Sequence, residues 1–170
     1  MIKQVEKFLK AFGEKHGPFD RVLDIGSKDE GGVGTVRDFI PNHNTYVGLD
    51  MREGKNVDIV MNAHDIGKKW KRPSFDLVTC TDTLEHDDKF WVTISQMRRV
   101  LRPGGWLLIT VPSLKHKFHP HPSDYWRFFE TSMLEWLEGY EEIVTSIGCW
   151  SDGANDSMPD EILGYGRKPK

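Results

Sequence analysis

The sequence predicts an α/β fold, with a mostly parallel sheet and helices on both of its faces. Two observations predict it. Short apolar runs bounded by turn residues alternate with segments of helical periodicity, a pattern typical of right-handed β-α-β crossovers. The runs at 75–80 and 106–111 are apolar with little alternation, as expected of strands covered on both faces.

The first half of the chain begins with an amphipathic helix. Apolar residues recur at helical spacing and predict that it occupies residues 1–17, ending near Gly13 or Gly17. A short helix is expected at 35–40, and a helical turn or loop at 65–70. Three strands are expected in this half, at 21–25, 45–49 and 57–61.

The second half continues the alternation. A fourth strand is expected at 75–80 and a helix at 90–101, and Pro103-Gly104-Gly105 predicts a turn before the fifth strand. A further helix is expected at 131–137, and the last two strands at 142–150 and 161–167. Because no helix separates those two strands, one of them should run antiparallel to the rest.

Composition limits the class of protein. The 170 residues are long enough for one substantial core, so we expect a single domain spanning 1–170. A net charge of −3 argues against broad capture of nucleic acid or of an anionic membrane. We see neither a signal peptide nor an apolar run of membrane-spanning length. We therefore expect a cytoplasmic protein, with Cys80 and Cys149 as reduced core residues.

Two strand ends predict a binding site for a nucleotide-like cofactor. The run 22–25 ends in a glycine loop, and the run 46–49 ends at Asp50. In an open parallel sheet, such a loop approaches the ligand and such an acid holds ribose hydroxyls. The phosphate-binding pattern G-x-G-x-x-G is absent, and Asp29 and Glu30 would repel a pyrophosphate. The loop therefore favours a sulfonium cofactor over NAD.

Five motifs in the right order resemble the class I S-adenosylmethionine-dependent methyltransferases, of the small single-domain, methyltransferase type 11-like kind. The motifs are 22–27, 48–50, 62–65, 75–86 and 99–105, and the resemblance covers roughly residues 20–168. It implies a Rossmann-like, mostly parallel seven-stranded sheet whose last strand is antiparallel. It also implies S-adenosylmethionine as the cofactor. The first loop departs from the family pattern, because Lys28 and Glu30 stand where further glycines are usual.

The resemblance also implies roles for individual residues. Asp24, Gly26 and Ser27 would organise the methionine end of the cofactor, and the backbone at Thr81 would meet its ammonium group. Asp50 would hold the ribose. The adenine pocket would be lined by Met51, His64 and Asp65.

The sequence contains fewer motifs that would locate the binding site of the methyl acceptor. We expect residues 113–130 to form a lid or acceptor loop, in which Asp124 and Arg127 could pair if Ser123 caps a short helix. His86 and His121 are the candidate catalytic bases, since imidazole accepts a proton near neutral pH. His116 and His119 next to His121 suggest a metal, but no second ligand set is visible and we expect none.

These patterns predict a methyltransferase that moves a methyl group to an oxygen or nitrogen of a small molecule or glycan. The motifs of amino-directed and pyrimidine-directed nucleic acid methyltransferases are absent, so a nucleic acid substrate is disfavoured. One alternative is a non-catalytic module that retains the cofactor pocket. Another, weaker one is an NAD-binding oxidoreductase. A homodimer could complete the acceptor pocket, because the chain is short.

Overall fold

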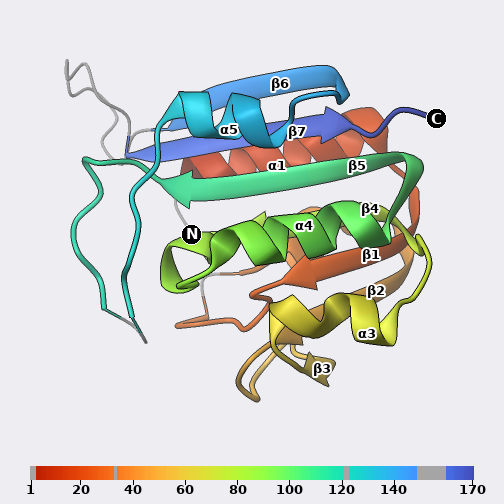
Figure 1. The fold of residues 1–170 in the computed structure, drawn as a ribbon, viewed down its shortest axis with the longest axis horizontal. Helices are drawn as coiled ribbons and strands as arrows, with labels where there is room; N and C mark the ends of the chain where they lie inside the picture. Colours follow the sequence, from red (N-terminus) through yellow and green to blue (C-terminus); the bar gives the residue numbers. More distant parts are fainter. Residues whose placement is uncertain (1–2, 33, 121–122, 149–159) are drawn as a thin grey trace.

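The computed structural model describes residues 3–32, 34–120, 123–148 and 160–170. Their centre is a seven-stranded sheet in the order β3-β2-β1-β4-β5-β7-β6 (Figure 1). The strands are β1 (Phe19–Ile25), β2 (His43–Asp50), β3 (Ile59–Val60), β4 (Phe75–Thr81), β5 (Leu101–Pro112), β6 (Glu141–Gly148) and β7 (Glu161–Arg167). The first five strands pair in parallel, and β7 runs antiparallel to both β5 and β6. The predicted Rossmann-like fold with an antiparallel last strand is therefore confirmed.

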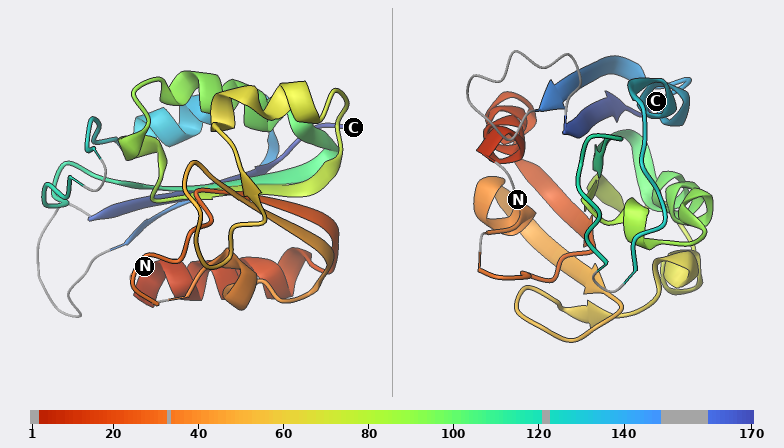
Figure 2. Two further views of the ribbon diagram at one scale, coloured as in Figure 1. Left: turned by 90° about the horizontal axis from the view of Figure 1, so that it is seen from below. Right: turned by 90° about the vertical axis from the view of Figure 1, so that its left-hand side faces the viewer.

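Helices cover both faces of the sheet, as Figure 2 shows. On one face lie α1 (Lys3–His16) and α2 (Val36–Phe39), and on the other lie α3 (Ile66–Lys69), α4 (Phe90–Val100) and α5 (Glu130–Trp136). Two 3₁₀ turns, η1 (Ala63–Asp65) and η2 (Leu84–His86), precede α3 and α4. The two faces carry separate apolar clusters, which explains why the central strands are apolar on both sides.

The helix α1 follows directly from its sequence pattern. Val5, Leu9 and Phe12 recur at the spacing of one helix face and are buried against the sheet. Its neighbour on the same face is α2, which it meets where Gly13 lies against Ile40. The amide of Gly17 donates to the carbonyl of Gly13 (3.0 Å), and this bond ends the helix.

The predicted turn at Pro103-Gly104-Gly105 is wrong, because these residues belong to β5. Leu101 pairs with Phe75 and Trp106 with Leu77, so β5 advances by more residues than β4 and the register of the pair shifts here. The glycines do not reverse the chain, because their backbone groups bond to Lys168. Gly104 donates to its carbonyl (2.8 Å), and its amide donates to Gly105 (2.8 Å).

The parallel strands place their carboxyl ends at one edge of the sheet. Ligands of open α/β sheets bind at this edge, and the segment after β5 extends beyond it in Figure 1. Cys80 is a buried free thiol in β4, as expected, while Cys149 lies outside the described residues. In the described part of the chain, no helix is long and apolar enough to cross a membrane.

Candidate functional site

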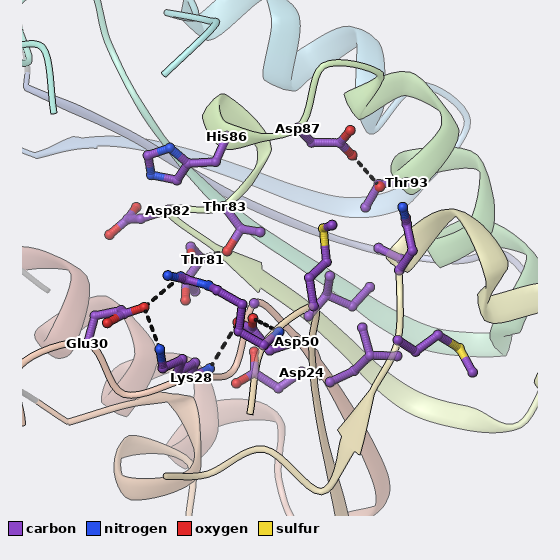
Figure 3. A pocket seen from close by; sticks show the side chains of 18 of the residues that line it. Asp24, Lys28, Glu30, Asp50, Thr81, Asp82, Thr83, His86, Asp87 and Thr93 are labelled. Atoms are coloured by element: carbon purple, nitrogen blue, oxygen red, sulfur yellow. Dashed lines mark hydrogen bonds and ion pairs between the residues drawn. The ribbon is translucent and has the colours of Figure 1, made fainter. Parts of the chain in front are cut away.

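A cavity of about 570 Å³ opens at the carboxyl ends of β1, β2 and β4, within the range of small-molecule pockets. Figure 3 shows side chains from each strand end, with Asp24 from β1, Asp50 from β2 and Thr81 from β4. The segment after β4 supplies Asp82, Thr83, His86 and Asp87. Of the residues that the sequence assigned to the cofactor, the cavity is lined by Asp24, Gly26, Asp50, Met51, His64 and Thr81.

Gly26 makes the turn that ends β1. Its φ is +74°, a conformation that favours glycine. Its amide donates to the carbonyl of Leu49 (2.8 Å), which ties the turn to the end of β2. A Cβ at this position would lie 1.9 Å from Oγ1 of Thr83. The glycine therefore lets three strand ends close around the cavity.

Asp50 is held in place by backbone amides. The amide of Arg52 donates to its Oδ1 (2.9 Å), and the amide of Lys28 donates to its Oδ2 (3.4 Å). A carboxylate offers about four acceptor positions, so each oxygen retains one for a ligand. Two adjacent acceptors at a strand end match the hydroxyl pair of a ribose.

The acids of the first loop are each paired with a cation. Arg52 (2.6 Å) and Lys28 (3.2 Å) both contact Oε1 of Glu30, while Lys55 lies 2.8 Å from Oδ2 of Asp29. These pairs offset the negative charge that the sequence alone suggested. The loop should therefore repel a pyrophosphate less strongly than its sequence suggests.

Asp24 is buried beneath the cavity. The hydroxyl of Tyr46 donates to its Oδ2 (2.6 Å), and the hydroxyl of Thr79 donates to its Oδ1 (2.7 Å). Burial raises the pKa of Asp24 to about 6, although the two hydroxyl donors act in the opposite direction. The carboxyl group of Asp24 thus lines the cavity and also accepts hydrogen bonds from side chains inside the sheet.

Met51 and His64 also line the cavity. Met51 is 67% exposed, which is unusual for a methionine in a folded domain and leaves its thioether available to a ligand. Nε2 of His64 lies 2.9 Å from Oδ1 of Asp87. The same oxygen accepts a hydrogen bond from the amide of Lys89 (2.9 Å). Asp87 thus fixes the imidazole, a role that its local Asp-x-Lys sequence does not reveal.

Two residues assigned from the sequence do not line the cavity. The hydroxyl of Ser27 donates to the carbonyl of Asn56 (3.1 Å), and its amide donates to Leu49 (3.1 Å). Asp65 pairs with Lys68 across one helical turn at 2.7 Å. Both stabilise the turns next to the cavity, and their side chains point elsewhere.

The segment after β5 is bound to the segment after β4. The amide of Tyr125 donates to the carbonyl of Glu85 (2.8 Å), and the indole of Trp126 donates to the carbonyl of Asp87 (2.9 Å). Nδ1 of His86 contacts the carbonyl of Ser123. These bonds place His119, Ser123 and Tyr125 on the cavity wall.

The expected pair of Asp124 and Arg127 forms, but without a helix, because residues 123–127 are irregular. Arg127 instead stabilises the loop by donating to the carbonyls of His116 (3.1 Å) and Lys117 (3.0 Å). The hydrogen-bonded ion pair with Arg127 holds the pKa of Asp124 well below its usual range. The second candidate base, His121, lies outside the described residues.

Glu85 lies beside the cavity, in the same 3₁₀ turn as His86. The residue is fully buried in η2. Burial raises the pKa of its carboxyl group, and the nearby carboxylate raises the pKa of His119. The periodicity of apolar residues in the sequence could not indicate that Glu85 and His119 lie together, because His119 belongs to a loop more than thirty residues later.

The comparisons with known proteins agree with this geometry. Residues 1–141 match the family described as a methyltransferase domain. The chain belongs to this family. The cofactor of this methyltransferase is S-adenosylmethionine, as the resemblance implied, and the match favours methyl transfer over the oxidoreductase alternative. Among curated proteins, none matches the sequence.

Solved structures share the fold of this methyltransferase at low sequence identity. A SAM-dependent methyltransferase from Archaeoglobus fulgidus matches with a TM-score of 0.74 at 16% identity, covering 98% of this chain and 94% of its own. The N-methyltransferase NodS from Bradyrhizobium japonicum WM9, in complex with S-adenosyl-L-homocysteine, gives 0.70 at 16% identity, with 99% and 87% covered. The 1,6-didemethyltoxoflavin-N1-methyltransferase of Burkholderia thailandensis gives 0.68 at 16% identity, with 99% and 78% covered.

Proposed function

We propose that this methyltransferase moves the methyl group of S-adenosylmethionine to an oxygen or nitrogen atom of a small molecule or glycan. The observation that supports it best is the layout of the cavity. The ribose-type acceptor Asp50 lies at the end of β2, and His86 and His119 line the same cavity from the segments after β4 and β5. The residues proposed for the donor and those proposed for the acceptor thus line one continuous cavity. Two of the similar structures are N-methyltransferases.

The cofactor is proposed to lie across the strand ends. Asp50 accepts both ribose hydroxyls, using the lone pairs that Arg52 and Lys28 leave open. Met51 and His64 contact the adenine, and Asp65 supports this end through the turn it stabilises.

The methionine end of the cofactor is proposed to lie over β1 and β4. Gly26 permits close approach of the backbone, Asp24 faces this end from below, and the carbonyl of Thr81 accepts from the ammonium group. Ser27 contributes by holding the turn in shape.

The acceptor is proposed to bind between η2 and residues 113–130, which act as the lid or acceptor loop of a single domain. The carbonyl of Ser123 accepts the Nδ1 proton of His86, so Nε2 of that imidazole carries the lone pair that can take a proton from the acceptor. Because the donor is intrinsically reactive, alignment and water exclusion supply most of the catalysis.

The proposal is tested with S-adenosylmethionine labelled in its methyl group and a panel of phenols, sugar alcohols and amines. We expect label on an oxygen or nitrogen atom, and loss of turnover in His86→Ala with S-adenosylhomocysteine binding retained. His43→Ala, at the opposite edge of the sheet, is the matched control and should keep full turnover. Label on carbon would contradict the proposal. Cofactor binding without transfer to any acceptor would favour the non-catalytic module.

A further inference from the structure

Three side chains with metal-ligating atoms converge at the rim of the cavity. Glu85 and His86 come from η2, and His119 comes from the loop after β5. Nε2 of His86 and Nε2 of His119 each lie 3.6 Å from Oε1 of Glu85. One ligand atom from each residue can be chosen so that all lie within 4.8 Å of one another. Two imidazoles thus face the same carboxylate oxygen.

The spacing is too long for direct hydrogen bonds and suits a shared ion. Hydrogen bonds between nitrogen and oxygen are about 2.7–3.2 Å long. A tetrahedral ion with ligands at about 2.1 Å holds those ligand atoms about 3.4 Å apart. The two 3.6 Å separations at Glu85 lie close to the second value.

Glu85 supplies an independent indication of a missing partner. It is 0% exposed, and neither of its carboxylate oxygens has a hydrogen-bond partner among the described residues. A buried, unsatisfied carboxylate is costly, and proteins normally pair such groups or bind a metal with them. Oε1 of this carboxylate is the oxygen that the two imidazoles face.

The backbone presents the imidazoles in the form that binds metals. Nδ1 of His86 contacts the carbonyl of Ser123, and Nδ1 of His119 lies 3.1 Å from the carbonyl of Lys117. The carbonyl of Ser123 accepts from Nδ1 of His86, so in the neutral imidazole the lone pair lies on Nε2, on the side of Glu85. Nδ1 of His119 also lies 3.4 Å from Nη2 of Arg127, and in the tautomer protonated at Nδ1 its Nε2 has a lone pair directed toward the same carboxylate. The nearby cation Arg127 has both oxygens of Asp124 as its partners, so its charge is compensated.

We propose that Glu85, His86 and His119 bind a divalent transition-metal ion such as Zn²⁺. Two imidazoles and one carboxylate are a ligand set for zinc and related ions, and three protein ligands leave a coordination position open. His86 and His119 line the cavity, so the open position is accessible to a ligand there. The sequence showed no further ligands beside His116, His119 and His121. In the structure, η2 supplies two of them, Glu85 and His86.

The role of the ion, unlike its binding, rests on the proposed function. An oxygen or nitrogen of the acceptor would complete the coordination shell beside the methyl donor. In the loaded state Nε2 of His86 is a ligand and positions the acceptor through the ion. In the metal-free state the same atom is available as the base.

The test is calorimetric titration of untagged, chelator-treated protein with Zn²⁺, and separately with Mg²⁺. We expect one saturable Zn²⁺ site per chain and no binding of Mg²⁺, which prefers oxygen ligands. Glu85→Gln, His86→Ala and His119→Ala should each weaken Zn²⁺ binding at least about tenfold. The matched control is His64→Ala, since His64 lines the same cavity but is paired with Asp87. It should bind Zn²⁺ as the wild type does.

Absence of saturable Zn²⁺ binding by the wild type would overturn the proposal, as would equal binding by all variants. If Glu85→Gln fails to fold, His119→Ala decides the matter, because that residue lies on a loop and is partly exposed. S-adenosylhomocysteine is titrated into the same metal-free protein. A failure of the metal site is thereby distinguished from a failure of the methyltransferase proposal.

Discussion

Thr83 occupies the space that any side chain at Gly26 would need, since a Cβ there would lie 1.9 Å from its Oγ1 and 2.8 Å from its Cβ. The contact joins the turn after β1 to the turn after β4, directly at the cavity. It makes glycine a steric requirement of the site in addition to a conformational one.

We predict that Gly26→Ala lowers the free energy of unfolding by about 2–4 kcal/mol. A positive φ costs alanine about 1 kcal/mol, and overpacking adds about 1–3 kcal/mol. Urea denaturation measures the change. Gly31→Ala is the matched control, because Gly31 also has a positive φ (+94°) but no atom within 4 Å of the added Cβ. Equal losses in the two variants would show that the contact with Thr83 is relieved at little cost.

Asp24 predicts a pH-dependent term in stability. Its pKa is raised from 3.8 to about 6 by burial, so the folded protein binds a proton that the unfolded chain has released between these values. The free energy of unfolding should therefore fall as the pH rises from below 4 to above 6. A shift of this size corresponds to about 3 kcal/mol.

The measurement compares the wild type with Asp24→Asn by denaturation between pH 4 and 7. The variant should lack this term, so the stability difference between the two proteins should change by about 2 kcal/mol between pH 4 and 7. Asp20→Asn, in the same strand but at its exposed start, is the control. A difference between wild type and Asp24→Asn that is independent of pH would contradict the raised pKa.

Arg127 is predicted to hold the loop after β5 in place. Its partner Asp124 accepts the amide of His119 at 2.8 Å. Arg127→Ala should therefore expose that amide, and its hydrogen exchange should accelerate at least about tenfold, the loss of roughly one charge-assisted hydrogen bond. Arg102→Ala, whose ion pair with Asp76 lies at the start of β5, should leave this exchange unchanged. Unaltered exchange at His119 in Arg127→Ala would show that other contacts order the loop.

The fold could be predicted from the sequence because its signals are local. Amphipathic spacing in α1 and apolar runs in β1, β4 and β5 are set by which faces are buried. The prediction of a turn at Pro103-Gly104-Gly105 was wrong, because a local motif cannot show that the backbone of Lys168 will form hydrogen bonds with these glycines. Tertiary pairing overrode the local preference.

The site was only partly predictable for the same reason. Asp50 and Gly26 lie at strand ends, where the topology alone places them at the cavity. The sequence could not show that Ser27 turns toward Asn56, or that His119 meets Glu85. Such contacts depend on the paths of loops, and these carry no periodic signal.

Asp50 is proposed to hold the ribose of S-adenosylmethionine in this cavity. Calorimetric titration with S-adenosylhomocysteine tests it most directly, on the wild type, on Asp50→Asn and on Asp20→Asn as control. Asn retains an oxygen for the amide of Arg52 but loses acceptors for two hydroxyls. We expect saturable binding that Asp50→Asn weakens at least about tenfold and Asp20→Asn leaves unchanged, with no binding of NAD. Undiminished binding by Asp50→Asn would show that Asp50 does not hold the ribose, and binding of NAD alone would show that the cavity is built for another cofactor.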